Sequence, residues 1–155
     1  MVDSQAEFLF VCMGNICRSP LAEGIFLHHV EKRGLNYRAD SAGLGNWHLG
    51  EPADPRSIAV AKKHDMKLVS RARQVSPHDF SRFNLLLAMD KQNQTDLFAL
   101  CDPEHRNKIR LMREFDPEGG TEAEVPDPYY GDAAGFERVF TMLNRSCLGL
   151  LEFLS

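Results

Sequence analysis

The sequence has little of what marks secreted, membrane-bound or metal-binding proteins. Its 155 residues include only four cysteines at irregular spacing, too few for the disulfide framework of a secreted domain. Residues 1–7 are polar and acidic, unlike a signal peptide, and no apolar run reaches membrane-spanning length. We therefore expect reduced thiols, a cytoplasmic location and no membrane partner.

Basic surfaces and metal-ligand clusters are also missing. The formal net charge is -4, whereas a protein that follows nucleic-acid phosphates usually carries a basic excess. Cys12 and Cys17 have no second Cys/His pair to complete a zinc site, and the six histidines are not spaced as metal ligands. We expect no nucleic-acid partner, no metal and no cofactor.

No stretch is rich enough in glycine, serine or proline to form a linker between domains. The apolar fraction of 43% is sufficient for one hydrophobic core. These features predict a single domain spanning residues 1–155, and they leave its oligomeric state open.

What the sequence does contain is an alternation of predicted strands and helices. Residues 8–11 are continuously apolar, which is typical of a strand buried on both faces. Three further segments have the composition of strands: residues 37–41, 85–89 and 109–112. Helices are predicted to begin at four capping residues or prolines: Ser19, Pro55, Asp90 and Asp132. The alternation predicts an α/β fold with an open, mostly parallel sheet flanked by helices on both faces.

Two predicted loops are candidates for function. In open parallel sheets, ligands bind at the carboxyl ends of the strands, where the loop Cys12–Ser19 follows the first strand. Residues 114–131 carry prolines, glycines and several acids, which predicts a long exposed loop. The first of these loops contains the stronger chemical signal.

The Cys12–Ser19 loop combines an anion site with a nucleophile. A loop that joins a strand to a helix amino terminus presents several backbone N–H groups together with the positive end of the helix dipole. It lacks the Gly-Lys-Ser/Thr ending and the three spaced glycines of nucleotide-binding loops. Arg18 could hold two oxygens of the same anion, and these positive groups favour the thiolate form of Cys12. The alternative, a buried inert cysteine, would not require this strand, loop and helix context.

Five segments together resemble the low-molecular-weight protein tyrosine phosphatases, and the similarity spans the chain. They are residues 11–20, 40–43, 72–74, 89–90 and 127–130. The resemblance implies a four-stranded parallel sheet with a phosphate loop between the first strand and first helix. It also implies metal-free hydrolysis through a phosphocysteine on Cys12, with Arg18 binding phosphate and Asp127 as the general acid and base.

The same resemblance assigns supporting roles around the nucleophile. The phosphate loop and its supporting residues would be Met13, Gly14, Asn15, Ile16, Cys17, Ser19 and Ser41. Asn15, Ser19 and Ser41 would form a hydrogen-bond network, with the Ser19 hydroxyl donating to the thiolate in competition with its capping role. Cys17 would trap oxidised Cys12 as a disulfide.

Three aromatic residues are candidates for the walls of a substrate pocket. Tyr129 and Tyr130 adjoin Asp127, and Trp47 lies in a loop after the second predicted strand. These residues could also have purely structural roles: the tyrosines could cover a sheet edge, and Trp47 could anchor its loop in the core. Asp127 could likewise be only a turn-forming residue.

Two positions depart from the pattern of this phosphatase family. Ser70 stands where some members carry histidine, and Met13 replaces a common leucine.

Two other functions compete with hydrolysis. An arsenate reductase would need two further paired cysteines, and no close pair follows Cys17. A binding module without turnover would lack the nucleophile, the arginine or the acid. We predict an enzyme that hydrolyses a phosphotyrosine-containing protein or a small aryl phosphate.

Overall fold

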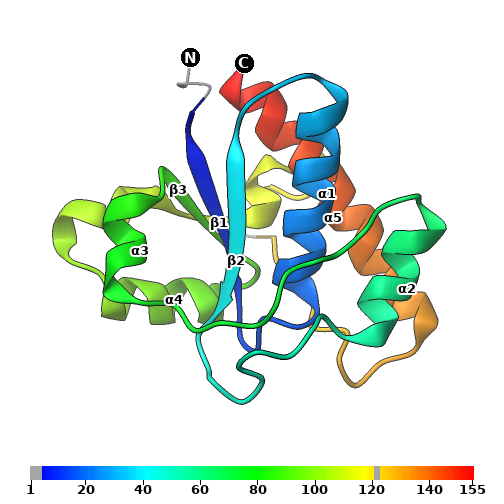
Figure 1. Ribbon diagram of the computed structural model, residues 1–155. Coiled ribbons are helices and arrows are strands. Elements are labelled where there is room, and N and C mark those ends of the chain that lie inside the picture. Colours follow the sequence, from blue (N-terminus) through cyan, green and yellow to red (C-terminus); the bar gives the residue numbers. More distant parts are fainter. Residues whose placement is uncertain (1–4, 121–122) are drawn as a thin grey trace.

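A computed structural model describes residues 5–120 and 123–155 and contains a four-stranded, wholly parallel sheet (Figure 1). Its strands are β1 (Glu7–Cys12), β2 (Arg38–Gly43), β3 (Leu85–Ala88) and β4 (Ile109–Leu111). Their order across the sheet is β2-β1-β3-β4, so β1 is paired on both sides. The predicted open parallel sheet is confirmed, and every strand end lies within two residues of the sequence prediction.

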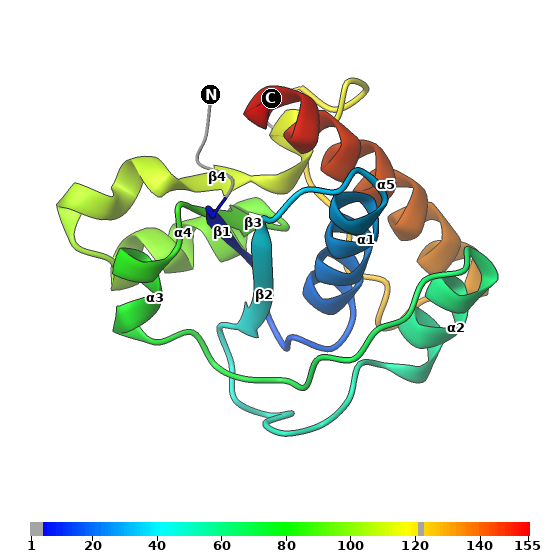
Figure 2. The same cartoon turned by 45° about the horizontal axis from the view of Figure 1, so that its top comes forward.

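Helices cover both faces of this sheet, as the sequence predicts. The helices are α1 (Arg18–Lys32), α2 (Pro55–Lys63), α3 (Pro77–Arg82), α4 (Lys91–Leu100) and α5 (Ala133–Leu154), with 3-10 turns η1 (Pro103–Lys108) and η2 (Met112–Phe115). Figures 1 and 2 show α1, α2 and α5 on one side of the strands and α3 and α4 on the other. In the part of the chain that the structure describes, no helix is both long and apolar enough to cross a membrane.

The apolar run in β1 belongs to two hydrophobic clusters at once. Phe8 and Phe10 pack with residues of α1 and α5, whereas Leu9 and Val11 pack with α3, α4 and β4. These side chains point alternately to the two faces of the sheet, and all four are fully buried because helices cover both faces. Each contributes about 1.5–3 kcal/mol of burial free energy, which makes β1 the centre of the fold.

Helix capping is confirmed at two of the predicted positions and corrected at a third. The carboxylates of Asp90 and Asp132 accept backbone hydrogen bonds from Asn93 and Gly135, as N-caps do. Ser19, however, does not cap α1. The helix begins at Arg18, two residues before the start that a Ser19 cap predicts, and the Ser19 hydroxyl is directed at the Cys12 sulfur instead.

Two segments differ from the sequence prediction. α3 was not predicted, although Ser76 and Asp79 form a capping box in which the Asp79 carboxylate accepts from the Ser76 backbone. The segment 114–131 is not uniformly exposed, because Asp116 and Val125 are buried. The Val125 N–H donates to the carbonyl of Met89 at the end of β3, which draws this segment against the sheet.

Candidate active site

The loop between β1 and α1 curls back against the end of β2. Asn15 adopts a left-handed backbone conformation with φ of 60°, which asparagine tolerates better than most residues. A Cβ atom added at Gly43 would lie 2.9 Å from the Met13 carbonyl oxygen and 3.1 Å from the Asn15 nitrogen. Glycine at position 43 therefore allows the strand end to pack directly on the loop.

The Cys12 sulfur lies at the base of this loop and contacts a hydroxyl group. Cys12 Sγ is 3.0 Å from Ser19 Oγ, and Asn15 Nδ2 donates to the same hydroxyl oxygen over 2.8 Å. Asn15 Oδ1 in turn accepts from the Arg73 N–H at 2.9 Å, which fixes the orientation of the amide. Because the Ser19 oxygen accepts from Asn15, its own hydrogen is available to the Cys12 sulfur.

Ser41, which the resemblance predicted to join Asn15 and Ser19, bonds to Glu23 instead, because β2 passes beside α1. Its hydroxyl donates to Glu23 Oε1 over 2.6 Å, and Ser70 also hydrogen-bonds the Glu23 carboxyl group. Burial raises the pKa of Glu23 to about 7. Sequence reasoning missed Glu23; the signal that could have found it is an acidic residue on the apolar face of α1.

Arg18 is a buried cation that is held from two sides. Its side chain is 3% exposed, and Nη1 donates to Asp90 Oδ2 at 2.7 Å and to the Val125 carbonyl at 3.0 Å. Burial alone would lower the pKa of Arg18, but the negative charges of Cys12 and Asp90 raise it overall. The guanidinium is therefore a fixed positive charge beside the Cys12 sulfur.

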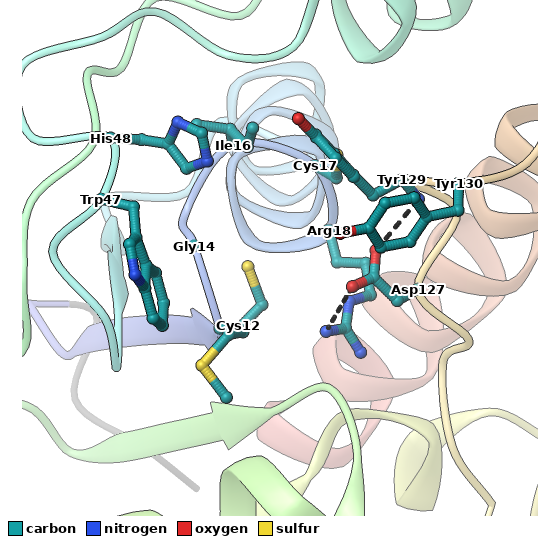
Figure 3. A pocket seen from close by; sticks show the side chains of 11 residues that line it. Cys12, Gly14, Ile16, Cys17, Arg18, Trp47, His48, Asp127, Tyr129 and Tyr130 are labelled. Atoms are coloured by element: carbon teal, nitrogen blue, oxygen red, sulfur yellow. Dashed lines mark hydrogen bonds and ion pairs between the residues drawn. The ribbon is translucent and has the colours of Figure 1, made fainter.

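A pocket of about 360 Å³ opens above the Cys12 sulfur. It is lined by Cys12, Met13, Gly14, Ile16, Cys17, Arg18, Trp47, His48, Asp127, Tyr129 and Tyr130. Figure 3 shows Trp47 and His48 on one side of Cys12, and Asp127 with the two tyrosines on the other. Trp47 is 66% exposed, so its alternative role as an anchor in the core is wrong.

His48 was not predicted to line this pocket. Its ring lies against Gly14, where an added Cβ would be 3.2 Å from His48 Cδ2, and its Nδ1 is 3.2 Å from Glu51 Oε1. A single histidine in a loop carries no spacing pattern, and only the path of the chain after β2 brings it here.

Asp127 serves as a turn residue and also faces the pocket. Its Oδ1 accepts from the Tyr129 N–H at 3.0 Å, while Oδ2 lies 3.7 Å from Arg18 Nη2 (Figure 3). The side chain is 49% exposed, so the carboxyl group is accessible to solvent and to a ligand. One geometry thus allows Asp127 both to form the turn and to line the pocket.

All four cysteines lie in described residues and are free thiols. Burial, followed by the charge of Asp54, raises the pKa of Cys17 to about 12, so this thiol is protonated at neutral pH. Within residues 5–120 and 123–155, no group of three or more histidine, cysteine or acidic side chains is arranged to hold a metal ion.

The chain matches one protein family over almost its whole length. The family model described as low molecular weight phosphotyrosine protein phosphatase matches residues 7–155. The chain belongs to this family. The predicted enzyme class, a low-molecular-weight protein-tyrosine-phosphatase, is thereby confirmed.

Individual relatives support the same assignment of this phosphatase. A low-molecular-weight protein-tyrosine-phosphatase of Streptomyces coelicolor is 47% identical over 92% of this chain and 89% of its own. The crystal structure of a protein tyrosine phosphatase from Entamoeba histolytica superposes with a TM-score of 0.93 at 38% identity, covering 97% of both chains. Wzb from Vibrio vulnificus, solved in complex with benzylphosphonate, matches with a TM-score of 0.84 at 28% identity and covers 97% of this chain and 99% of its own.

Proposed function

We propose that this phosphatase hydrolyses phosphotyrosine in proteins, and small aryl phosphates, through a phosphocysteine intermediate on Cys12. One observation carries the proposal. A cysteine sulfur and a buried guanidinium from the two ends of the loop between β1 and α1, and a half-exposed carboxyl group from a distant segment, line the same pocket. Nucleophile, phosphate clamp and proton donor are the three groups that such a hydrolysis requires.

In the first step, the Cys12 thiolate attacks the phosphorus atom while the bond from phosphorus to the tyrosine oxygen breaks. Arg18 and the backbone N–H groups of residues 13–18 hold the non-bridging oxygens and offset their charge. Asp127 gives its proton to the departing phenolate oxygen. The products are a phosphocysteine, a free tyrosine hydroxyl and an Asp127 carboxylate.

In the second step, the Asp127 carboxylate removes a proton from a water molecule, which attacks the phosphocysteine. The sulfur–phosphorus bond breaks, inorganic phosphate leaves and the Cys12 thiolate is restored. The hydrogen bond from Ser19 stabilises this thiolate as a leaving group, because it is strongest when the sulfur is charged. Asp127 ends the cycle protonated, ready for the next substrate.

We propose that Trp47, Tyr129 and Tyr130 select aromatic leaving groups. Trp47 lies across Cys12 from the two tyrosines, which leaves a slot with apolar walls above the sulfur (Figure 3). Tyr129 and Tyr130 meet edge to face, with ring centroids 4.9 Å apart. The benzylphosphonate complex of the Vibrio relative supports an aromatic ring next to the phosphoryl group.

We further propose that peroxide converts the Cys12 thiolate to a sulfenic acid, which Cys17 then attacks to give a disulfide and water. Cys17 lines the same pocket, and its raised pKa keeps it from reacting as a thiolate at rest. Peroxide inactivation should then be reversed by a thiol reductant, and less completely in Cys17→Ser. Mass spectrometry of inactive, recoverable enzyme without this disulfide would contradict the proposal.

A panel of phosphotyrosine peptide, phosphoserine peptide and nitrophenyl phosphate, assayed with chelator present, tests the main proposal. Arsenate with thioredoxin is included as the competing activity. We expect turnover of the two aryl substrates at least about a hundredfold above phosphoserine. Arsenate reduction without aryl phosphate hydrolysis would overturn the proposal. The cytoplasmic location, the single domain and the absence of nucleic-acid partners stay predictions.

A further inference from the structure

Arg56 lies outside the pocket lining but connects two of the segments that line it. It is the second residue of α2, whose N-cap is Asp54. Arg56 Nε and Nη2 each donate to an oxygen of Asp54 over 3.0 Å, which makes a bidentate pair. Its third nitrogen, Nη1, donates to the Gly131 carbonyl at 3.3 Å.

The flat face of the same guanidinium packs against two aromatic rings. Its central carbon lies 4.5 Å from the ring centroid of Phe136 and 5.5 Å from that of Tyr129. Phe136 is a buried residue of α5, whereas Tyr129 is a pocket wall. Figure 1 shows α2 beside the first turns of α5 (orange), where this stacking occurs. The planar cation therefore uses its edge for hydrogen bonds and its face for ring contacts.

The Asp54 end of this connection is attached to the phosphate loop. The Asp54 N–H donates to the Ile16 carbonyl at 2.8 Å, and Ser57 Oγ donates to the Cys17 carbonyl at 3.2 Å. The start of α2 is thus bonded to the second half of the loop that carries Cys12.

The Gly131 end is attached to a compact turn. Asp127 Oδ1 accepts from the Tyr129 N–H at 3.0 Å, and the Gly131 N–H donates to the Pro128 carbonyl at 2.8 Å. Because of these hydrogen bonds, a displacement of Gly131 or Tyr129 would also displace Asp127. Because Asp127 is half exposed, the packing of its own side chain does not hold it in place.

We propose that Arg56 is a positioning residue, which fixes the Asp127–Gly131 turn over the phosphate loop so that Asp127 can reach the leaving-group oxygen. The inference rests on the proposed acid role of Asp127. Arginine is needed because lysine cannot make the bidentate pair with Asp54, donate to Gly131 and stack on Tyr129 at the same time. Arg56 itself touches neither phosphate nor substrate in this scheme.

Arg56→Lys is the test variant, and Arg82→Lys is its matched control. Arg82 also pairs with a carboxylate, Glu7, and stacks on a ring, Phe83, but at the opposite end of β1 from the pocket. Three quantities are measured for each variant: the melting temperature, the dissociation constant of inorganic phosphate, and single-turnover rates for phosphotyrosine and nitrophenyl phosphate. Arg56→Lys is also made in an Asp127→Asn background.

For Arg56→Lys we expect about a tenfold loss in the single-turnover rate for phosphotyrosine, because a displaced acid protonates a poor leaving group less well. The rate for nitrophenyl phosphate should fall less than about threefold, since nitrophenolate leaves with little protonation. Phosphate affinity should be unchanged, and the loss should nearly vanish in the Asp127→Asn background. Arg82→Lys should keep all rates.

Wild-type turnover of phosphotyrosine is measured first, because its absence contradicts the proposed function itself. If the wild type is active, equal losses for both substrates, weaker phosphate binding or full additivity with Asp127→Asn would overturn the role of Arg56. So would an Arg56→Lys variant that behaves like Arg82→Lys.

Discussion

Two clusters of arginine and aspartate in this phosphatase are built with opposite burial. In the pocket cluster, Arg18 is 3% exposed, while its partners Asp90 and Asp127 are 23% and 49% exposed. In the second cluster the carboxylate of Asp116 is fully buried, and Arg113 and Arg145 are 15% and 27% exposed. The first buries its cation and the second its anion.

Their hydrogen bonding differs in the same way. Each oxygen of Asp116 accepts two bonds, from Glu118 N–H and Arg145 Nε on one side and from Arg113 Nε and Arg145 Nη2 on the other. Arg18, by contrast, donates two hydrogen bonds through Nη1, while Nη2 lies 3.7 Å from Asp127 Oδ2 at the edge of the pocket. A saturated pair fastens segments together, whereas a buried cation that borders a cavity can receive an anionic ligand.

The strongest test of the pocket cluster is Cys12→Ser. Turnover should fall by about ten-thousand-fold or more, because serine is a far weaker nucleophile at neutral pH. Inorganic phosphate should still bind, since Arg18 and the loop N–H groups are retained. Steady-state rates and calorimetric titration with phosphate measure both quantities, and substantial activity in the variant would contradict the covalent mechanism.

The next largest effect is expected for Asp127→Asn. Its single-turnover rate for phosphotyrosine should drop by about a hundred- to ten-thousand-fold, while nitrophenyl phosphate suffers less. Equal losses for both substrates, or a lower melting temperature that accounts for them, would return Asp127 to a turn-forming role.

Glu23 sharpens the comparison, because it is a buried carboxyl group whose hydrogen-bond donors are hydroxyls. Its pKa is raised from 4.5 to about 7, so the folded state binds the proton more tightly than the unfolded state. Its contribution to stability is therefore present at low pH and is lost as the pH rises from 4.5 through 7. Relative to Glu23→Gln, wild type should lose about 3 kcal/mol of unfolding free energy across this range. Urea unfolding of both proteins at pH 5 and pH 8 measures it, and parallel pH profiles would refute the prediction.

Asp116 should behave in the opposite sense and with a smaller effect. Although burial favours its neutral form, hydrogen bonds from Arg145, Glu118 N–H and Arg113 lower the pKa below 3.8. Its contribution is therefore present above that pH and is lost as the pH falls through the folded-state pKa. Asp116→Asn should cost about 1–2 kcal/mol at neutral pH and leave turnover per folded molecule unchanged. The difference in unfolding free energy between wild type and Asp116→Asn, measured by urea unfolding, should become smaller as the pH falls. A difference that grows in acid would contradict the lowered pKa of Asp116.

The local features of the sequence were sufficient for the fold class and for the centre of the site. The apolar run of β1 predicts a strand buried on both faces, and the Cys12–Ser19 loop predicts an anion site at its carboxyl end. Asp90 and Asp132 mark helix starts because an N-cap depends only on residues three positions apart. Each of these signals acts over a few neighbouring residues, so a single sequence reveals it.

Other features were decided by the tertiary structure alone. The Ser19 hydroxyl contacts both the Cys12 sulfur and the Asn15 amide instead of capping α1, and Ser41 bonds to Glu23 because β2 passes beside α1. His48 reaches the pocket, and Arg56 reaches the Asp127–Gly131 turn, through the packing of segments distant in the chain. Sequence periodicity reports which face of an element is apolar, but the partner of a buried polar group depends on which elements the topology brings together.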